Sequence, residues 1–284
     1  MDAGDHTFAA FAPAEGSDEK LPVLLFQSGY GSTPASHAVL MQAIADGGYV
    51  CVVPARERDN CGQETIPKVF AGMAEGKSAG EQNAVSTDGT HLKAALEWVK
   101  GQKDGKVLGQ AIDVTKIAAG GFSMGCLEAM IFSGQNMDVV GACIVISSSS
   151  GAAIESLYEF SQADLEAKVA AFTFPSLFIA SDKDCQLGAT KEVFAKAAAP
   201  STILVFKDAH LDLSMAMTNE TSAWGPGTND MFPGLRQHFA LAAEAKDVCS
   251  EPIVKFLDAT FKGKDAVAGI SMAPDGALAE VFTK

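Results

Sequence analysis

Short apolar runs alternate along the chain with segments whose apolar residues recur at spacings of three and four. The first pattern predicts buried strands and the second predicts amphipathic helices. In chain order, the predicted strands are 21–29, 48–55, 116–122, 139–147, 175–181 and 202–209. The predicted helices are 37–48, 86–102, 124–134, 187–198 and 251–263, the second capped by Ser86, Thr87 or Asp88. Strands that alternate with helices predict an α/β fold, with a mainly parallel sheet covered on both faces.

The length and composition are those of a chain that can bury a large core. Because 48% of the 284 residues are hydrophobic and the mean hydropathy is +0.14, we expect one α/β domain over 1–284, with its core at about 8–262. Two irregular stretches, about 56–85 and 211–235, exceed ordinary loop lengths and are expected to be insertions that shape a binding site. No element is predicted for the tail, 263–284.

The charge balance excludes some partners. The chain carries 35 acidic and 21 basic residues, a net charge of −14, which disfavours nucleic acid and anionic lipid surfaces. No stretch approaches the roughly 20 apolar residues that cross a bilayer, so we expect no membrane span. The first 20 residues read as neither a signal nor a transit peptide, which favours the cytoplasm, although a trimmed chain would look the same. The oligomeric state is not indicated.

The cysteines do not form a metal or disulfide pattern. All six are far apart in the sequence and no C-x-x-C pair occurs, so reduced thiols and no metal site are expected. Cys51 and Cys143 fall within predicted strands, where a free cysteine packs as a small apolar residue.

One serine stands between glycines where an apolar run changes character. In GFSMG, residues 121–125, a strand is predicted to end at Phe122 and a helix to begin at Met124. The glycines have no Cβ to collide with the strand and helix that flank such a sharp turn. The turn exposes the serine hydroxyl at the carboxyl edge of the sheet, where the N–H groups of the next helix can stabilise a developing negative charge. The pattern favours Ser123 as a nucleophile over a small residue in an ordinary turn.

A serine nucleophile requires a base, and the base requires an acid. The predicted strand at 175–181 is followed by Asp182 and Asp184, and the next strand leads into His210. Because parallel strands end at the same edge of a sheet, these groups are expected on the same edge as Ser123.

The chain resembles the α/β-hydrolase fold in these residues. The resemblance rests on the order Ser123, Asp184, His210, on GFSMG at the turn, and on FQSGYGS after an early strand. It is most similar to the branch of dienelactone hydrolases, cutinases and PETase-like polyester hydrolases, over about residues 8–262. Further likeness to that branch lies in PVLLFQSGYGS, IADGGYVCVVPA and the closing helix VKFLDATFKGK.

The resemblance implies a role for each polar group. Asp184 corresponds to the acid of the family, while Asp182, the alternative, would shape the turn. His210 corresponds to the base that takes the Ser123 proton and returns it to the leaving alcohol. Of the other histidines, His91 and His238 lie in or near predicted helices, where surface roles are expected. His37 follows the early loop and could border a substrate, but a core or surface role is favoured.

The resemblance also implies an oxyanion hole and the walls of a cleft. The backbone N–H groups of Met124 and Tyr30 would form the hole, and the Tyr30 ring one wall. Phe122 stands where the family has histidine or tryptophan, which keeps the site apolar. The opposing aromatic wall of the polyester hydrolases is replaced by Ser147 to Ser150, unless Trp224 from the loop SAWGPGTND supplies it.

The expected activity follows from this resemblance. It implies a serine carboxylesterase without cofactor, acting on short-acyl, aromatic or polyester-like esters as small molecules or polymers. A thioesterase, an acyltransferase, a peptidase or a chlorophyllase-like pigment esterase would use the same triad. A catalytically silent protein of this fold that only binds a ligand is the alternative from another class, and it would be expected to have lost a triad residue. Dienelactone hydrolases use a cysteine nucleophile, so Ser123 argues against that chemistry.

Overall fold

The strands form a mostly parallel sheet, as the alternating pattern predicted. The computed structural model describes residues 2–3, 6–29, 34–55, 75, 88–102, 104–148, 161–184, 186–207, 239–264 and 278–284. Nine strands lie in the order β1-β2-β4-β3-β6-β7-β8-β9-β10, and β5 pairs with β6 beside this path. From β4 to β9 in this order all neighbours are parallel, whereas β1, β2 and β10 pair in antiparallel fashion. The strands are β1 (Asp2–Ala3), β2 (His6–Phe11), β3 (Leu21–Gln27), β4 (Val50–Ala55), β5 (Lys106–Val107), β6 (Gln110–Phe122), β7 (Val140–Ile146), β8 (Ser176–Ser181), β9 (Ser201–Phe206) and β10 (Leu278–Thr283).

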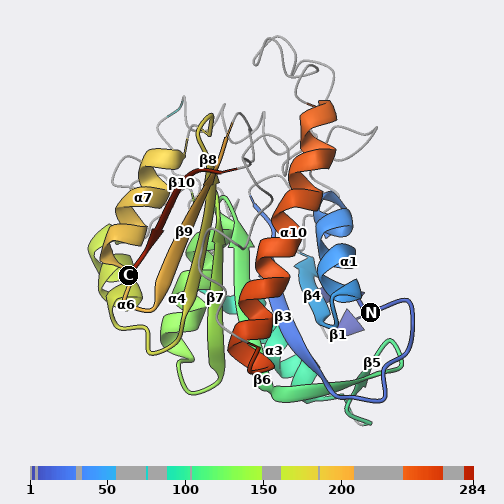
Figure 1. The fold of residues 1–284 in the computed structure, drawn as a ribbon. Coiled ribbons are helices and arrows are strands. Elements are labelled where there is room, and N and C mark those ends of the chain that lie inside the picture. Colours follow the sequence, from blue (N-terminus) through green and yellow to red (C-terminus); the bar gives the residue numbers. More distant parts are fainter. Residues whose placement is uncertain are drawn as a thin grey trace.

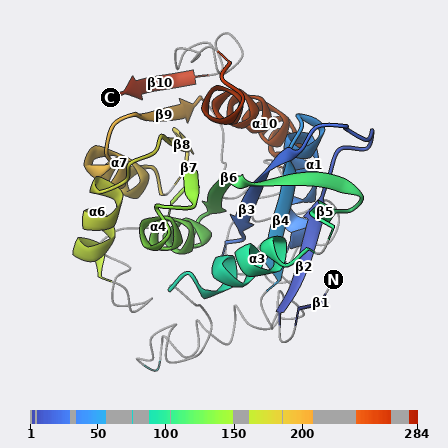
Figure 2. The same cartoon turned by 90° about the horizontal axis from the view of Figure 1, so that it is seen from below.

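Helices cover both faces of the sheet, which explains why the central strands are apolar throughout (Figures 1 and 2). Along β3, Val23 and Leu25 belong to one core cluster, and the alternate residues Leu24 and Phe26 belong to the other. The first cluster lies under α3 (Thr90–Lys100), α4 (Gly125–Gln135), α6 (Gln162–Ala170) and α7 (Leu187–Lys196). The second lies under α1 (Ala38–Asp46), which follows the 3-10 turn η1 (Pro34–His37), and under α10 (Phe239–Phe261).

The sequence pattern missed the strands β1, β2, β5 and β10 and the helix α6. Strand β6 begins at Gln110 instead of 116, because it extends into a hairpin with β5 through Leu108 and Gly109, both with positive φ. Helix α6 was not predicted, although the Ser161 side chain caps it by accepting from the Asp164 N–H at 3.2 Å. The tail residues 278–283 form β10, which pairs with β9 and covers that edge of the sheet.

Helix α10 is longer than predicted. The sequence predicted the last helix over 251–263. The observed helix begins at Phe239 and continues through Pro252 to Phe261. The buried face that holds it to the sheet includes Cys249, Ile253 and Leu257, so tertiary packing outweighs the local break.

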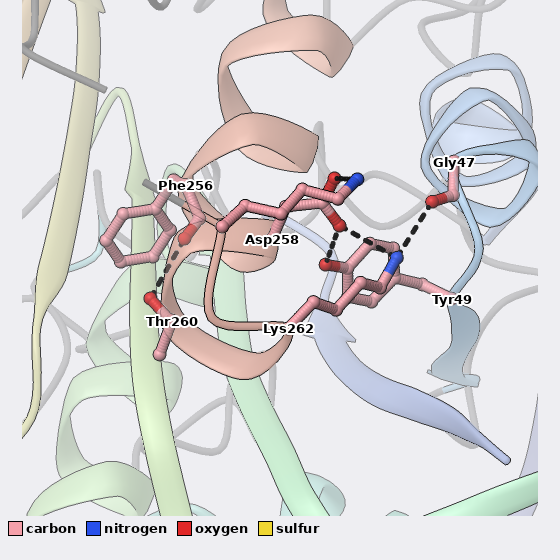
Figure 3. A network of polar contacts seen from close by, with 7 residues as sticks. Gly47, Tyr49, Phe256, Asp258, Thr260 and Lys262 are labelled. Carbon is pink, nitrogen blue, oxygen red and sulfur yellow. Dashed lines mark hydrogen bonds and ion pairs between the residues drawn. The ribbon is translucent and has the colours of Figure 1, made fainter. Parts of the chain in front are cut away.

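A polar clasp holds the end of α10 to the start of β4 (Figure 3). The Tyr49 hydroxyl donates to Asp258 Oδ1 at 2.7 Å, and both residues are buried. Lys262 and Lys264 pair with the two oxygens of Asp258 at 2.7 and 2.6 Å. Burial alone would raise the pKa of Asp258, but the hydrogen bonds from the two lysines and Tyr49 lower it below its usual value. The clasp lies where β4 begins, at the opposite edge of the sheet from the end of β6.

Four cysteines, Cys51, Cys126, Cys143 and Cys249, are buried free thiols. Burial raises the pKa of Cys143 to about 12, so this thiol stays protonated near neutral pH. The other two cysteines, Cys61 and Cys185, lie outside the described residues. No helix within the described ranges is long and apolar enough to cross a membrane.

Candidate active site

The turn that carries Ser123 has an unusual backbone. Strand β6 ends at Phe122 and α4 begins at Gly125, so the predicted junction of strand and helix is confirmed. Ser123 has a φ of +53°, a left-handed conformation that side chains other than glycine rarely adopt. Its N–H donates to Ile146 O at 2.9 Å, and its carbonyl accepts from the Cys126 N–H at 3.1 Å. These bonds hold the left-handed residue between β7 and the first turn of α4.

The two glycines around Ser123 are required by close packing of the backbone. A Cβ on Gly121 would collide with the backbone of Gly125. A Cβ on Gly125 would collide with the backbone at the end of β3, at Gln27 and Ser28. The interpretation of these glycines from the sequence is therefore confirmed, because no other residue fits without moving backbone.

Asp184 is buried at the end of β8 and accepts three hydrogen bonds from the described residues. It is 7% exposed. The Ser181 N–H donates to Oδ2 at 2.9 Å, and the Ser181 hydroxyl donates to Oδ1 at 2.7 Å. The third donor is the Ser147 hydroxyl, 2.6 Å from Oδ2, which comes from the end of β7. Hydrogen bonds donated in this way hold a buried carboxylate in one orientation and compensate its negative charge.

Asp182 has a different environment. Its N–H donates to Phe206 O at 2.9 Å, which continues the pairing of β8 with β9. Its side chain is 27% exposed and, among the described residues, pairs with Lys183 at 4.0 Å. Of the two aspartates considered from the sequence, Asp184 has the surroundings that favour a positioned acid.

Gln186 links the loop after β8 to the turn at Ser123. Its Nε2 donates to Ser123 Oγ at 3.3 Å, so the residues after β8 and the end of β6 meet in space. Within the described part of the chain, its other amide atom, Oε1, is buried without a hydrogen-bond partner. The sequence reasoning missed Gln186, and its only signal was its place two residues after Asp184.

The early loop packs against the serine turn. A Cβ on Gly29 would lie 2.8 Å from Phe122 Cδ1. The Phe122 ring is 2% exposed, and its centroid lies 5.6 Å from that of the fully buried His37. Phe122 therefore lies beneath the loop that continues into Tyr30, and its contact with a substrate stays a prediction. His37 has the core position that the sequence favoured.

Of the two predicted oxyanion donors, Met124 lies among the described residues and Tyr30 does not. Met124 is the residue before α4, so its N–H is one of those at a helix start that have no acceptor within the helix. Tyr30, His210 and Trp224 lie outside the described residues, as do Ser149, Ser150 and nearly all of the stretches 56–85 and 211–235.

Two further features of the described residues concern other kinds of site. No cluster of three or more His, Cys, Asp or Glu side chains suited to a metal ion occurs among the residues described. A hollow of about 920 Å³ is lined by Leu21, Lys116 and Lys262, at the edge of the sheet opposite Ser123, and so is separate from the candidate site.

The comparisons with known proteins give no family assignment. No family model matches the chain, and a search of curated proteins finds no match.

Proposed function

We propose that the protein is a serine carboxylesterase of the α/β-hydrolase fold, with Ser123 as nucleophile, Asp184 as acid and His210 as base. The observation that carries the proposal is the left-handed backbone of Ser123 between β6 and α4. Backbone strain of this kind persists where the surroundings enforce it, and it is concentrated at functional sites. A turn of this shape aims a hydroxyl away from the sheet edge, which is what a nucleophile requires.

Two further features support the proposal. The buried Asp184 lies at the end of β8, on the same edge as Ser123, and Gln186 connects the two regions. The strand order, with β4 outside β3 and an antiparallel β2 beyond it, supports the α/β-hydrolase part of the proposal.

The chemistry follows the usual steps of acyl transfer. Ser123 Oγ attacks the ester carbonyl carbon while His210 takes its proton, and Asp184 stabilises the resulting imidazolium. The N–H groups of Met124 and Tyr30 bind the oxyanion. The tetrahedral intermediate then collapses, and the alcohol leaves with the proton from His210. Water, activated by the same histidine, attacks the acyl-enzyme and releases the acid and Ser123.

Labelling with a fluorophosphonate tests the proposal, because only an activated serine reacts with it. We expect one covalent adduct on Ser123, hydrolysis of p-nitrophenyl butyrate, and loss of both in Ser123→Ala. Ser133→Ala is a matched control, since Ser133 is fully buried at the far end of α4. An unlabelled wild-type protein without esterase activity would leave a ligand-binding protein as the better hypothesis.

A further inference from the structure

Ser147 is a second left-handed serine at the carboxyl edge of the sheet. It follows β7 directly, has a φ of +46° and is fully buried. Apart from Ser123, the other non-glycine residue with positive φ in the described ranges is Leu108, in the β5–β6 hairpin turn. Such a turn explains the conformation of Leu108. It does not explain Ser147, because β7 pairs in parallel with both of its neighbours.

The left-handed backbone of Ser147 accompanies two bonds to β8 and its loop. Its N–H donates to Ile179 O at 2.8 Å, and its hydroxyl donates to Asp184 Oδ2 at 2.6 Å. Glycine would adopt this backbone without strain but would have no hydroxyl to offer. The presence of serine at a position suited to glycine points to a role for the hydroxyl.

The three donors to Asp184 are not equivalent. Ser181 is three residues from Asp184, so its two bonds belong to the local turn after β8. Ser147 is the donor from another strand, and it comes from β7, which pairs directly with the strand that carries Ser123. The N–H of Ser123 also bonds to Ile146 O, next to Ser147. One short segment of β7 thus contacts both the nucleophile turn and the acid.

We propose that Ser147 is a positioning residue of the hydrolytic site, which fixes the direction and charge of the Asp184 carboxylate through its hydroxyl. The proposal rests on the proposed function of Ser123 and Asp184. Without this donor, the carboxylate can rotate, and more negative charge remains on Oδ2. A misdirected carboxylate orients the base poorly, while a more negative one holds the protonated base more tightly.

The other groups near the carboxylate do not mask this effect. Cys249 of α10 interacts electrostatically with Asp184, and burial, with a smaller contribution from that charge, raises the pKa of the thiol. It therefore remains neutral between pH 5 and pH 9. Ser181 does not titrate in that range, and the Asp182 side chain pairs with Lys183. The proposal therefore assigns the titration between pH 5 and pH 9 to the proposed base, His210.

Two substitutions separate the effect of the Ser147 hydroxyl from the effect of its left-handed backbone. Ser147→Ala and Ser147→Gly both remove the donor, but only glycine also relieves the left-handed strain. We expect kcat/KM for p-nitrophenyl butyrate to fall about 10- to 100-fold in both variants, as for a lost hydrogen bond to a charged group. We also expect the acidic limb of the kcat/KM profile to move to higher pH by about half a unit, because the protonated base is held more tightly. Ser176→Ala, at the other end of β8 and 1% exposed, should change neither quantity.

The outcomes are distinguishable. If Ser147→Gly keeps wild-type kcat/KM and the wild-type pH limb, the hydroxyl has no catalytic role and the proposal is wrong. If Ser147→Ala does not fold, the glycine variant, checked by circular dichroism, decides alone. If wild-type protein neither hydrolyses esters nor reacts with the fluorophosphonate, the proposed function itself fails, and the role of Ser147 fails with it.

Discussion

At the scale of single residues, the requirements of folding and of chemistry oppose each other at Ser123. A left-handed backbone costs a non-glycine residue about 1–2 kcal/mol, and glycine avoids that cost. Part of this gain is offset, because glycine has about 0.5–1 kcal/mol more conformational entropy to lose on folding. The serine is therefore retained at a position that backbone energetics alone would give to glycine.

We expect Ser123→Gly to be more stable than Ser123→Ala by about 0.5–1 kcal/mol. In regular secondary structure, alanine is instead the more stabilising of the two residues. Both variants should lose ester hydrolysis by about 10⁴-fold or more, since neither has a nucleophile. Urea denaturation, with equal slopes for the two variants, measures the difference in the free energy of unfolding. Equal or reversed stabilities would mean that the turn is not left-handed in solution.

The two aspartates after β8 provide the second prediction at this scale. Asp184→Asn should lower kcat by about 10⁴-fold, because an amide favours the wrong tautomer of the base and cannot stabilise its charged form. Asp182→Asn should cost less than about tenfold, since this side chain is partly exposed and pairs with the exposed Lys183. Each variant serves as the control for the other when their kcat values are compared. A larger loss in the Asp182 variant would exchange their roles.

At the scale of elements, the clasp between β4 and α10 is expected to make stability depend on pH. The pKa of Asp258 is lowered in the folded protein, so its contribution is present above the unfolded pKa of about 3.9 and is lost as the pH falls through the folded value. Asp258→Asn should lower the free energy of unfolding at pH 7 by about 1–3 kcal/mol and flatten its dependence on pH below about pH 4.

Tyr49→Phe is the matched control for the clasp. It removes the hydroxyl that donates to Asp258 at 2.7 Å but keeps the carboxylate and its lysine partners. We expect a loss of about 1 kcal/mol and a smaller flattening of the pH dependence than in Asp258→Asn, because the lysine partners still lower the pKa of Asp258. Unfolding curves from pH 3 to pH 7 measure both variants. A flat profile for the wild-type protein in the acidic range would contradict the role of Asp258.

The elements that the sequence predicted are those whose pattern is local. The central strands are apolar because helices cover both faces, and this continuous apolar pattern is visible in a run such as Leu21–Gln27. The edge strand β10 has only intermediate and exposed residues, so it lacks such a signal. Its place depends on pairing with β9, for example Val281 with Leu204, which no local pattern reveals.

A residue that is distant in the sequence also stabilises the start of α3. Asp88, one of three capping residues expected there, accepts from the Thr90 N–H at 2.9 Å. The N–H groups of His91 and Leu92 instead donate to Glu128, a fully buried carboxylate on α4. Because this contact joins two helices, the capping residues nearby in the sequence could not have predicted it.

For the candidate site, the sequence predicted the backbone feature that depends on a local motif. GFSMG predicted the turn at Ser123, and Asp184 was favoured over Asp182 through the resemblance. Ser147 was considered only as the loss of an aromatic wall, because its bond to Asp184 joins residues 37 positions apart in the sequence. Gln186 and its contact with Ser123 were missed for the same reason, across 63 positions.

At the scale of the whole molecule, the two long stretches without predicted elements bear on substrate size. They follow β4 and β9, both of which are parallel members of the sheet, so both leave from the carboxyl edge that carries Ser123. Segments in this position are expected to cover part of a cleft at that edge, which favours small esters over a polymer chain.

We therefore expect efficient hydrolysis of p-nitrophenyl acetate and butyrate, a decline for acyl chains of eight carbons and more, and slow release of aromatic acid from polyester film. If the aromatic wall is replaced by serines, as the resemblance implies, a contact of about 0.5–1.5 kcal/mol is lost. A series of kcat/KM values from C2 to C12, run beside the film assay, measures this. A maximum at long chains would mean that the cleft is open, and film turnover equal to that of soluble esters would mean that another residue replaces the wall.

The uneven cover of the two sheet faces has a consequence for the order in which the protein can form during synthesis. One face is covered by α3, α4, α6 and α7, all of which precede residue 197. The other has α1 early in the chain, but its second helix, α10, arrives last, and the clasp joins residues 209 positions apart. Because domains emerge from the ribosome with the N-terminal part first, Ile144 and Ile179, on the strands β7 and β8 that α10 contacts, would wait uncovered for α10. During that interval this apolar face is the surface on which a nascent chain would need a chaperone.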